Sequence, residues 1–147
     1  MSVSIPALKC LPMHPIVTRS QRFTSLEKRA AAFAIYDKAH MLNYMGYTDN
    51  LYKSLKYHFI KYADNTYHYS YLSENTGFAM KHVDLIDNAW TAETGVPFIY
   101  EDNDLSFDLQ IESCRTYKNY LKALFKERRL NSGYHVMGDD TTITVIF

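Results

Sequence analysis

Apolar residues at helical spacing predict a first helix shortly after the start of the chain. Thr24-Ser25-Leu26-Glu27 has the form of a capping box, in which the Thr hydroxyl and the Glu carboxylate satisfy free backbone N–H groups. Five apolar residues follow at this spacing, and Gly46 is a natural stop: Ala31, Ala34, Ile35, Leu42 and Met45. We therefore expect a helix from Thr24 to Gly46, preceded by an irregular lead-in that contains three prolines.

Two further helices are predicted from similar patterns. One begins near Thr48, and its apolar stripe is formed by Leu51, Leu55, His58, Phe59 and Tyr62. Another begins at Ser113, and its stripe is formed by Tyr117, Tyr120, Leu121, Leu124 and Phe125. The pattern of residues 84–96 fits no single element.

Strand-like segments lie between and after these helices. They cover residues 66–72, 78–83, 98–100, 105–111, 134–137 and 141–147, and the first two are joined by turn residues as in a hairpin. In the first of them Tyr67, Tyr69 and Tyr71 lie on one face, and His68, Ser70 and Leu72 lie on the other. The predicted fold class is α+β, with a small antiparallel sheet and about three to four helices packed mainly on one face.

Length and composition place the whole chain, residues 1–147, in one domain. The chain is 47% hydrophobic, which is enough for one contiguous core. The start of the chain lacks the features of a signal peptide, no apolar run is long enough to span a membrane, and Cys10 and Cys114 show no pairing pattern. We therefore expect a cytoplasmic protein, in the host cell cytoplasm, without a membrane partner; its oligomeric state is left open.

Charge is sorted along the chain although the net charge is zero. Basic and acidic residues number 9 and 3 in residues 1–62, 1 and 9 in residues 63–110, and 6 and 4 in residues 111–147. The acidic stretch could oppose a basic partner, or it could be compensated by the protein's own basic helices. A neutral total argues against strong binding to DNA, so no direct sequence-specific nucleic-acid contact is expected.

No catalytic, cofactor or metal motif is present in the sequence. His68-Tyr69-Ser70 matches one half of a two-histidine phosphoesterase motif, but no second histidine precedes Ser or Thr at the required spacing. Asp102, Asp104 and Asp108 lack the glycine and the terminal Glu of a calcium loop. We therefore expect no enzyme activity, no cofactor, no metal and no catalytic residue. The 13 tyrosines suit either an interface or a core.

Two segments of the chain carry a recognisable order of motifs. In the first, Leu51-Tyr52 opens a helix, an aromatic strand follows, and a turn and the next strand contain Leu72, Ser73, Asn75, Gly77, Phe78 and Met80. The second runs from Phe98 to Phe125 and has a strand, a capping residue and an apolar helix. In these motifs the two segments resemble the ArdB/KlcA antirestriction family. The chain departs from the family in having one turn glycine instead of two, an apparent insertion at residues 84–96, and strands at residues 134–147.

The resemblance implies a non-enzymatic phage- or plasmid-encoded anti-defence protein. Such a protein would inhibit host type I restriction by binding a host restriction or other defence protein complex. Loops on a rigid scaffold often carry binding, so the candidate interaction surface is formed by Glu74, Asn75, Glu101, Asp102 and Asp104. The alternative is a structural or assembly protein of a virus particle, and a small hydrolase centred on His68 is a third, more distant reading.

Overall fold

The computed structural model describes two compact units of the chain. Described are residues 4–19, 23–24, 29–73, 80–101, 109–110, 126–128, 135–138 and 142–146. One unit contains Met1–Ile16 and Leu26–Asn103, and the other contains Val17–Ser25 and Asp104–Phe147. The expectation of a single domain over residues 1–147 stays a prediction.

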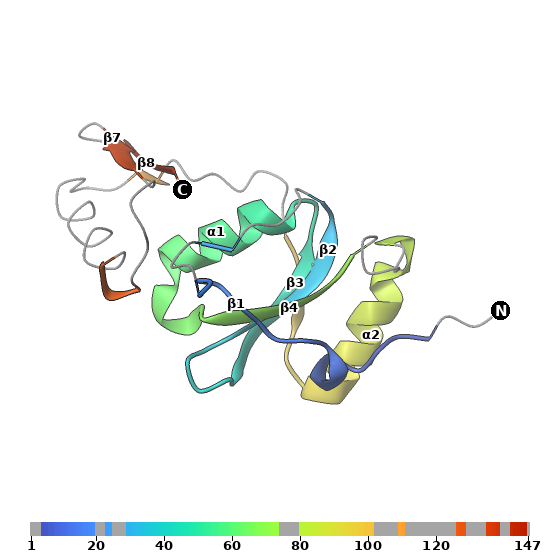
Figure 1. Cartoon of the computed structure of the whole chain (residues 1–147). Helices are drawn as coiled ribbons and strands as arrows, with labels where there is room; N and C mark the ends of the chain where they lie inside the picture. Colours follow the sequence, from blue (N-terminus) through green and yellow to red (C-terminus); the bar gives the residue numbers. More distant parts are fainter. Residues whose placement is uncertain are drawn as a thin grey trace. The chain divides into compact units, whose positions relative to one another are not determined.

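The larger unit is built on a five-stranded mixed sheet (Figure 1). Its strands lie in the order β1-β4-β2-β3-β5, and only the pair β3 and β5 is parallel. Their bounds are His14–Pro15 (β1), Ala31–Tyr36 (β2), Leu42–Thr48 (β3), His68–Ser73 (β4) and Phe98–Tyr100 (β5). The helices are α1 (Leu51–Lys61) and α2 (Val83–Thr94), with short 3-10 turns η1 (Leu8–Cys10), η2 (Ala63–Asn65) and η4 (Met80–His82).

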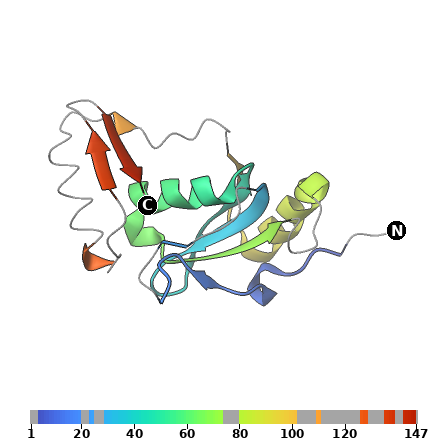
Figure 2. The ribbon, with the colours of Figure 1, turned by 45° about the horizontal axis from the view of Figure 1, so that its top comes forward.

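The two helices lie on opposite faces of this sheet (Figure 1 and Figure 2). Alternate residues of β2 explain the arrangement, because successive side chains of a strand point to opposite faces. Ala32, Ala34 and Tyr36 share a core cluster with Ile86 and Trp90 of α2. On the other face, the Phe33 ring packs against His58 of α1.

The predicted antiparallel sheet with three to four helices mainly on one face is therefore wrong. The described sheet is mixed because the connection through α2 returns β5 parallel to β3. Among the described residues, two helices and not three to four cover this sheet, one on each face. An α+β class remains plausible for this arrangement.

The helix predicted from Thr24 to Gly46 is also wrong, because β2 and β3 form a hairpin there. All six residues of β2 are buried, since the strand is covered on both faces and therefore shows no alternation of apolar and polar residues. In the connecting turn, Asp37 Oδ1 accepts hydrogen bonds from the backbone N–H groups of Ala39 and Met41, both at 2.9 Å. Of the predicted capping box, Ser25, Leu26 and Glu27 lie outside the described residues.

Gly46 lies within β3 and allows β5 to come close to it. A Cβ atom at this position would collide with the backbone carbonyl oxygen of Ile99 in β5. The glycine that the sequence suggests as a helix stop instead permits the parallel strand pair.

Helix α1 confirms the second predicted helix. Asn50, directly before it, is the N-cap, and its side chain accepts a hydrogen bond from the backbone N–H of Lys53 at 3.0 Å. Three apolar residues of the helix are buried: Leu51, Leu55 and Phe59.

Residues 80–94 form a 3-10 turn and a helix where the sequence left the assignment open or predicted a strand. Met80–His82 is a 3-10 turn and α2 begins at Val83, so the predicted return strand at residues 78–83 is wrong over its described part. Gly95 is the C-cap of the helix, and its φ of 73° lies in the left-handed region that glycine adopts without steric strain. Glu93 of α2 accepts hydrogen bonds from the backbone N–H groups of Leu8 and Lys9, which attaches the lead-in segment to the helix.

The smaller unit contains a three-stranded antiparallel sheet in the order β6-β8-β7. Its strands are β6 (Leu109–Gln110), β7 (His135–Gly138) and β8 (Thr142–Ile146), of which β7 and β8 run side by side (Figure 2). The two predicted C-terminal strands are thus confirmed. Of the helix predicted from Ser113, only residues 126–128 are described.

Across the described ranges, no helix combines the length and the apolar character that a membrane crossing requires.

Candidate functional site

Of the five predicted interface residues, only Glu101 lies among the described residues. Its side chain is 6% exposed, so the carboxylate points into the protein and not toward solvent. Glu74, Asn75, Asp102 and Asp104 lie outside the described residues. The predicted binding role of all five stays a prediction, and the structure adds a structural role for Glu101.

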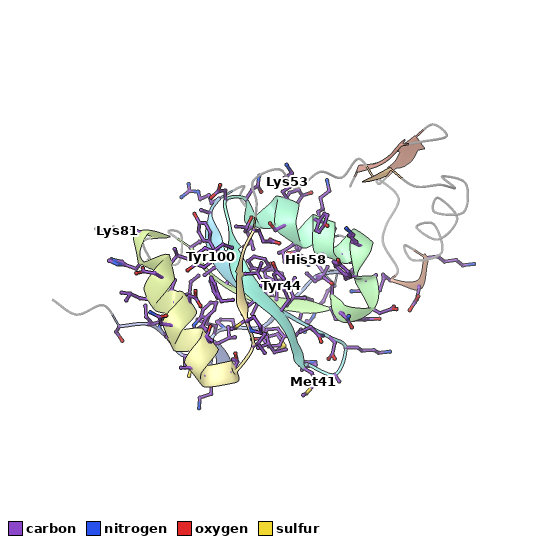
Figure 3. The ribbon with its side chains drawn as sticks, turned by 180° about the vertical axis from the view of Figure 1, so that it is seen from behind. Met41, Tyr44, Lys53, His58, Lys81 and Tyr100 are labelled. Carbon is purple, nitrogen blue, oxygen red and sulfur yellow. The ribbon has the colours of Figure 1, made fainter. Side chains whose placement is uncertain are left out.

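Glu101 belongs to a buried polar cluster with Tyr44 and His58. The side chains of Tyr44 and His58 are labelled in Figure 3. The Tyr44 hydroxyl donates to Glu101 Oε2 at 3.1 Å, and His58 Nε2 lies 2.9 Å from the same oxygen, where its N–H can donate. The three residues come from β3, from α1 and from the position directly after β5. They meet because Tyr44 and Glu101 point to the sheet face that α1 covers.

Aromatic rings surround the imidazole of this cluster. The His58 ring centre is 4.4 Å from that of Tyr44, and the rings of Tyr57, Phe33 and Tyr62 lie within 6.1 Å. Burial raises the pKa of Tyr44, and the adjacent negative charge of Glu101 raises it further. The phenol is therefore held as a neutral donor to the carboxylate.

The second oxygen of Glu101, Oε1, is buried and has no hydrogen-bond partner among the described residues. The His58 side chain is only 8% exposed, so the cluster offers a substrate little access. The arrangement of the cluster suits a structural role, in which it holds the end of β5 against α1, and not proton exchange with a ligand.

A second group of polar and aromatic residues lies on the other face, where β3, β5 and α2 meet. It consists of Tyr47, Asp49, Asp84, Asp87 and Tyr100, and we call it the acidic tyrosine surface. The Tyr100 hydroxyl donates to Asp87 Oδ2 at 3.0 Å, and the Tyr47 hydroxyl donates to Asp49 Oδ1 at 3.1 Å. The two tyrosine rings are 6.3 Å apart.

Three residues of the acidic tyrosine surface are exposed. Tyr100 is 51% exposed, and Asp49 and Asp84 are exposed as well. Burial and the hydrogen bond to Asp87 raise the pKa of Tyr100, and Asp84 raises it further. The surface thus combines flat neutral rings with carboxylates, the combination that an arginine or lysine of a partner protein prefers.

The predicted faces of β4 are confirmed, and the tyrosine side is largely covered. Tyr69 is buried, and the His14 ring packs against both Tyr69 and Tyr71, at 5.3 and 5.7 Å. Leu72, on the opposite face, belongs to the core with α2. These tyrosines therefore form part of the packing of β1 on β4.

His68 lies beside a histidine that sequence spacing did not indicate. The rings of His68 and His40 are 4.5 Å apart, and Ser70, the other polar residue of the half motif, donates to the carbonyl oxygen of Pro12. His40 lies in the exposed β2–β3 turn with a φ of 64°. Among the residues that the structure describes, no three His, Cys, Asp or Glu side chains are grouped to hold a metal ion.

Comparison of the chain with protein-family models, with curated proteins and with solved structures found no match.

Proposed function

We propose that this chain is a non-enzymatic, phage- or plasmid-encoded anti-defence protein that inhibits host type I restriction by binding a protein of the restriction complex. The resemblance of two of its segments to the ArdB/KlcA family supports the proposal. The observation that carries it is the acidic tyrosine surface, which offers a binding surface of suitable chemistry.

A protein that handles DNA exposes lysine and arginine side chains toward the phosphates. Such side chains fit the acidic tyrosine surface, because a guanidinium can stack on the ring of Tyr100 while it pairs with Asp84 or Asp87. Tyrosines and arginines are also the residues that contribute most to protein–protein affinity. The proposed mode of inhibition is therefore occupation of a basic surface on a protein of the restriction complex.

The acidic tyrosine surface is local and does not imitate DNA. The chain has 16 basic and 16 acidic residues, whereas imitation of a phosphate backbone requires a dense negative surface over the whole molecule. A few carboxylates beside exposed rings suit contact with one protein surface.

The proposal is tested by plating unmodified phage on a host with an active type I restriction system, with and without this protein. We expect the protein to raise the plating efficiency. Tyr100→Ala and Asp84→Lys should each abolish most of the rescue, because they remove the exposed ring and reverse a charge of the surface.

Asp64→Lys is the matched control, since Asp64 is an exposed aspartate in η2, outside the acidic tyrosine surface. This variant should retain rescue. Absence of rescue by the wild-type protein, despite soluble expression, would contradict the proposal, and detection of the protein in purified virus particles would favour the structural alternative.

A further inference from the structure

The outward side of α1 carries lysines and tyrosines only, as far as its side chains are described. Leu51, Leu55 and Phe59 face the sheet. The side chains that remain accessible are those of Tyr52, Lys53, Lys56, Tyr57 and Lys61. Lys53 points away from the sheet, whereas His58 points toward it (Figure 3). No Asp or Glu occurs in Leu51–Lys61, so the positive charge of this helix is not compensated within it.

The lysines are arranged beside the tyrosine rings. Lys56 Nζ is 5.5 Å from the ring centre of Tyr52. Lys61 Nζ is 5.2 Å from the ring of Tyr57 and 6.0 Å from that of Tyr62, and it donates to the Tyr57 hydroxyl at 2.8 Å. Tyr62, directly after the helix, is 48% exposed. Positive charges and ring faces are therefore presented together along one side of α1.

The opposite face of the sheet has the reverse charge. Helix α2 carries Asp84, Asp87 and Glu93 and no Lys or Arg within Val83–Thr94. The sheet lies between the two helices, so these carboxylates and the lysines of α1 are on opposite sides of it. The zero net charge of the chain conceals a basic face on this unit.

We infer that the face formed by Tyr52, Lys53, Lys56, Tyr57, Lys61 and Tyr62 is a binding site for single-stranded nucleic acid, without sequence preference. The ammonium groups contact phosphates, and the tyrosine rings offer surfaces on which unpaired bases stack. From Lys53 to Lys61 the helix rises about 12 Å, which is enough to follow a few nucleotides. This site is separate from the acidic tyrosine surface and goes beyond the proposed protein-binding function.

Single-stranded nucleic acid fits this face better than a duplex does. A duplex keeps its bases stacked inside and offers little to the exposed Tyr62 ring. The three lysines predict a modest salt dependence, with log affinity falling by about 2 per tenfold rise in salt.

The test measures the fluorescence anisotropy of a labelled oligothymidine and of a duplex of equal length. In low salt we expect the wild-type protein to bind the single strand about tenfold more tightly than the duplex. The double variant Lys53→Glu and Lys61→Glu should bind the single strand at least about tenfold more weakly. Tyr62→Ala should weaken single-strand binding about fivefold and leave duplex binding unchanged.

A double variant of two exposed lysines outside α1, Lys9→Glu and Lys38→Glu, has the same change of net charge and is the matched control. Its affinity should stay within about twofold of the wild type. Circular dichroism should show that both double variants are folded. The inference would be overturned by no single-strand binding in low salt, by equal losses in both double variants, or by equal or tighter binding to the duplex or to vesicles with anionic lipid.

Discussion

At the scale of single residues, the cluster of Tyr44, His58 and Glu101 is the least expected feature of the protein. A carboxylate that is moved out of water loses hydration, and only hydrogen bonds or an opposite charge offset that loss. Glu101 receives both donors on one oxygen. The cluster therefore connects α1 and the end of β5, and this contact is lost if either His58 or Glu101 is removed.

A double-mutant cycle of His58 and Glu101 should reveal this dependence. His58→Ala and Glu101→Ala should each lower the free energy of unfolding by about 2 kcal/mol, because each leaves a buried polar partner unsatisfied. The double variant should lose less than the sum, with a coupling of at least about 1 kcal/mol. Urea unfolding at neutral pH measures all four proteins.

The control for this cycle pairs Glu101→Ala with His40→Asn, which removes an exposed imidazole at a φ that asparagine also adopts. These two changes should add independently. Additive losses for His58 and Glu101 as well would mean that the two residues do not stabilise each other.

The raised pKa of Tyr44 predicts a loss of folding stability at alkaline pH. Its folded-state pKa is raised above the ordinary value of 10.0 by burial and by Glu101, so the fold favours the neutral phenol. This contribution is present in full below the ordinary pKa and is lost as the pH rises above it.

The comparison is between wild-type protein and Tyr44→Phe, unfolded by urea at about pH 8 and about pH 11. Stability should fall with pH in both proteins, because the pKa values of Tyr36, Tyr47, Tyr52 and Tyr100 are also raised. The fall should be smaller in Tyr44→Phe. An equal fall in the two proteins would show that Tyr44 does not stay neutral in the fold.

At the scale of elements, prediction succeeded where local chemistry decides the structure and failed where tertiary packing decides it. Helix α1 has a polar cap and one apolar face, so its pattern is unambiguous. The strand β2 is buried on both faces, and Ala31-Ala32-Phe33-Ala34 is as compatible with a helix as with a strand when viewed alone. Only the partners β3 and β4 establish it as a central strand.

The parallel pair of β3 and β5 predicts different outcomes for substitutions at two glycines. Gly46→Ala places a Cβ against the backbone of Ile99, which cannot move without breaking the strand pair. We expect a loss of about 3 kcal/mol in the free energy of unfolding. Gly95→Ala meets open space and bears only the strain of its positive φ, about 1 kcal/mol.

Thermal or urea unfolding of the two variants measures the difference. If Gly46→Ala were no more destabilising than Gly95→Ala, the close approach of β5 to β3 would be wrong.

At the scale of the whole molecule, the sorting of charge along the sequence becomes a sorting in space within the larger unit. The basic first third contributes α1 and the acidic middle contributes α2, and the sheet lies between them. Sequence counting detected the two charge blocks. It could not assign them to opposite faces, because that assignment depends on α2, for which the pattern of residues 84–96 gave no helix.

The candidate site was predictable only in its composition. The acidic stretch contains Asp84, Asp87 and Glu101. Because successive side chains of a strand point to opposite faces, Glu101 lies on the face of α1 and Tyr100 lies on the face of α2. The alternation of side chains along the predicted strand at residues 98–100 already places Tyr100 and Glu101 on opposite faces. The sequence does not show which helix covers each face. The partners of these two residues, Tyr44, Tyr47 and His58, are also more than 40 residues away in sequence.

The most direct test of the central claim is a titration of purified type I restriction complex with purified protein, measured by interferometry. We predict binding at micromolar affinity or better, weakened at least about tenfold by Asp84→Lys and changed less than about twofold by Asp64→Lys. Absence of binding by the wild-type protein, or equal binding by the two variants, would contradict inhibition through the acidic tyrosine surface.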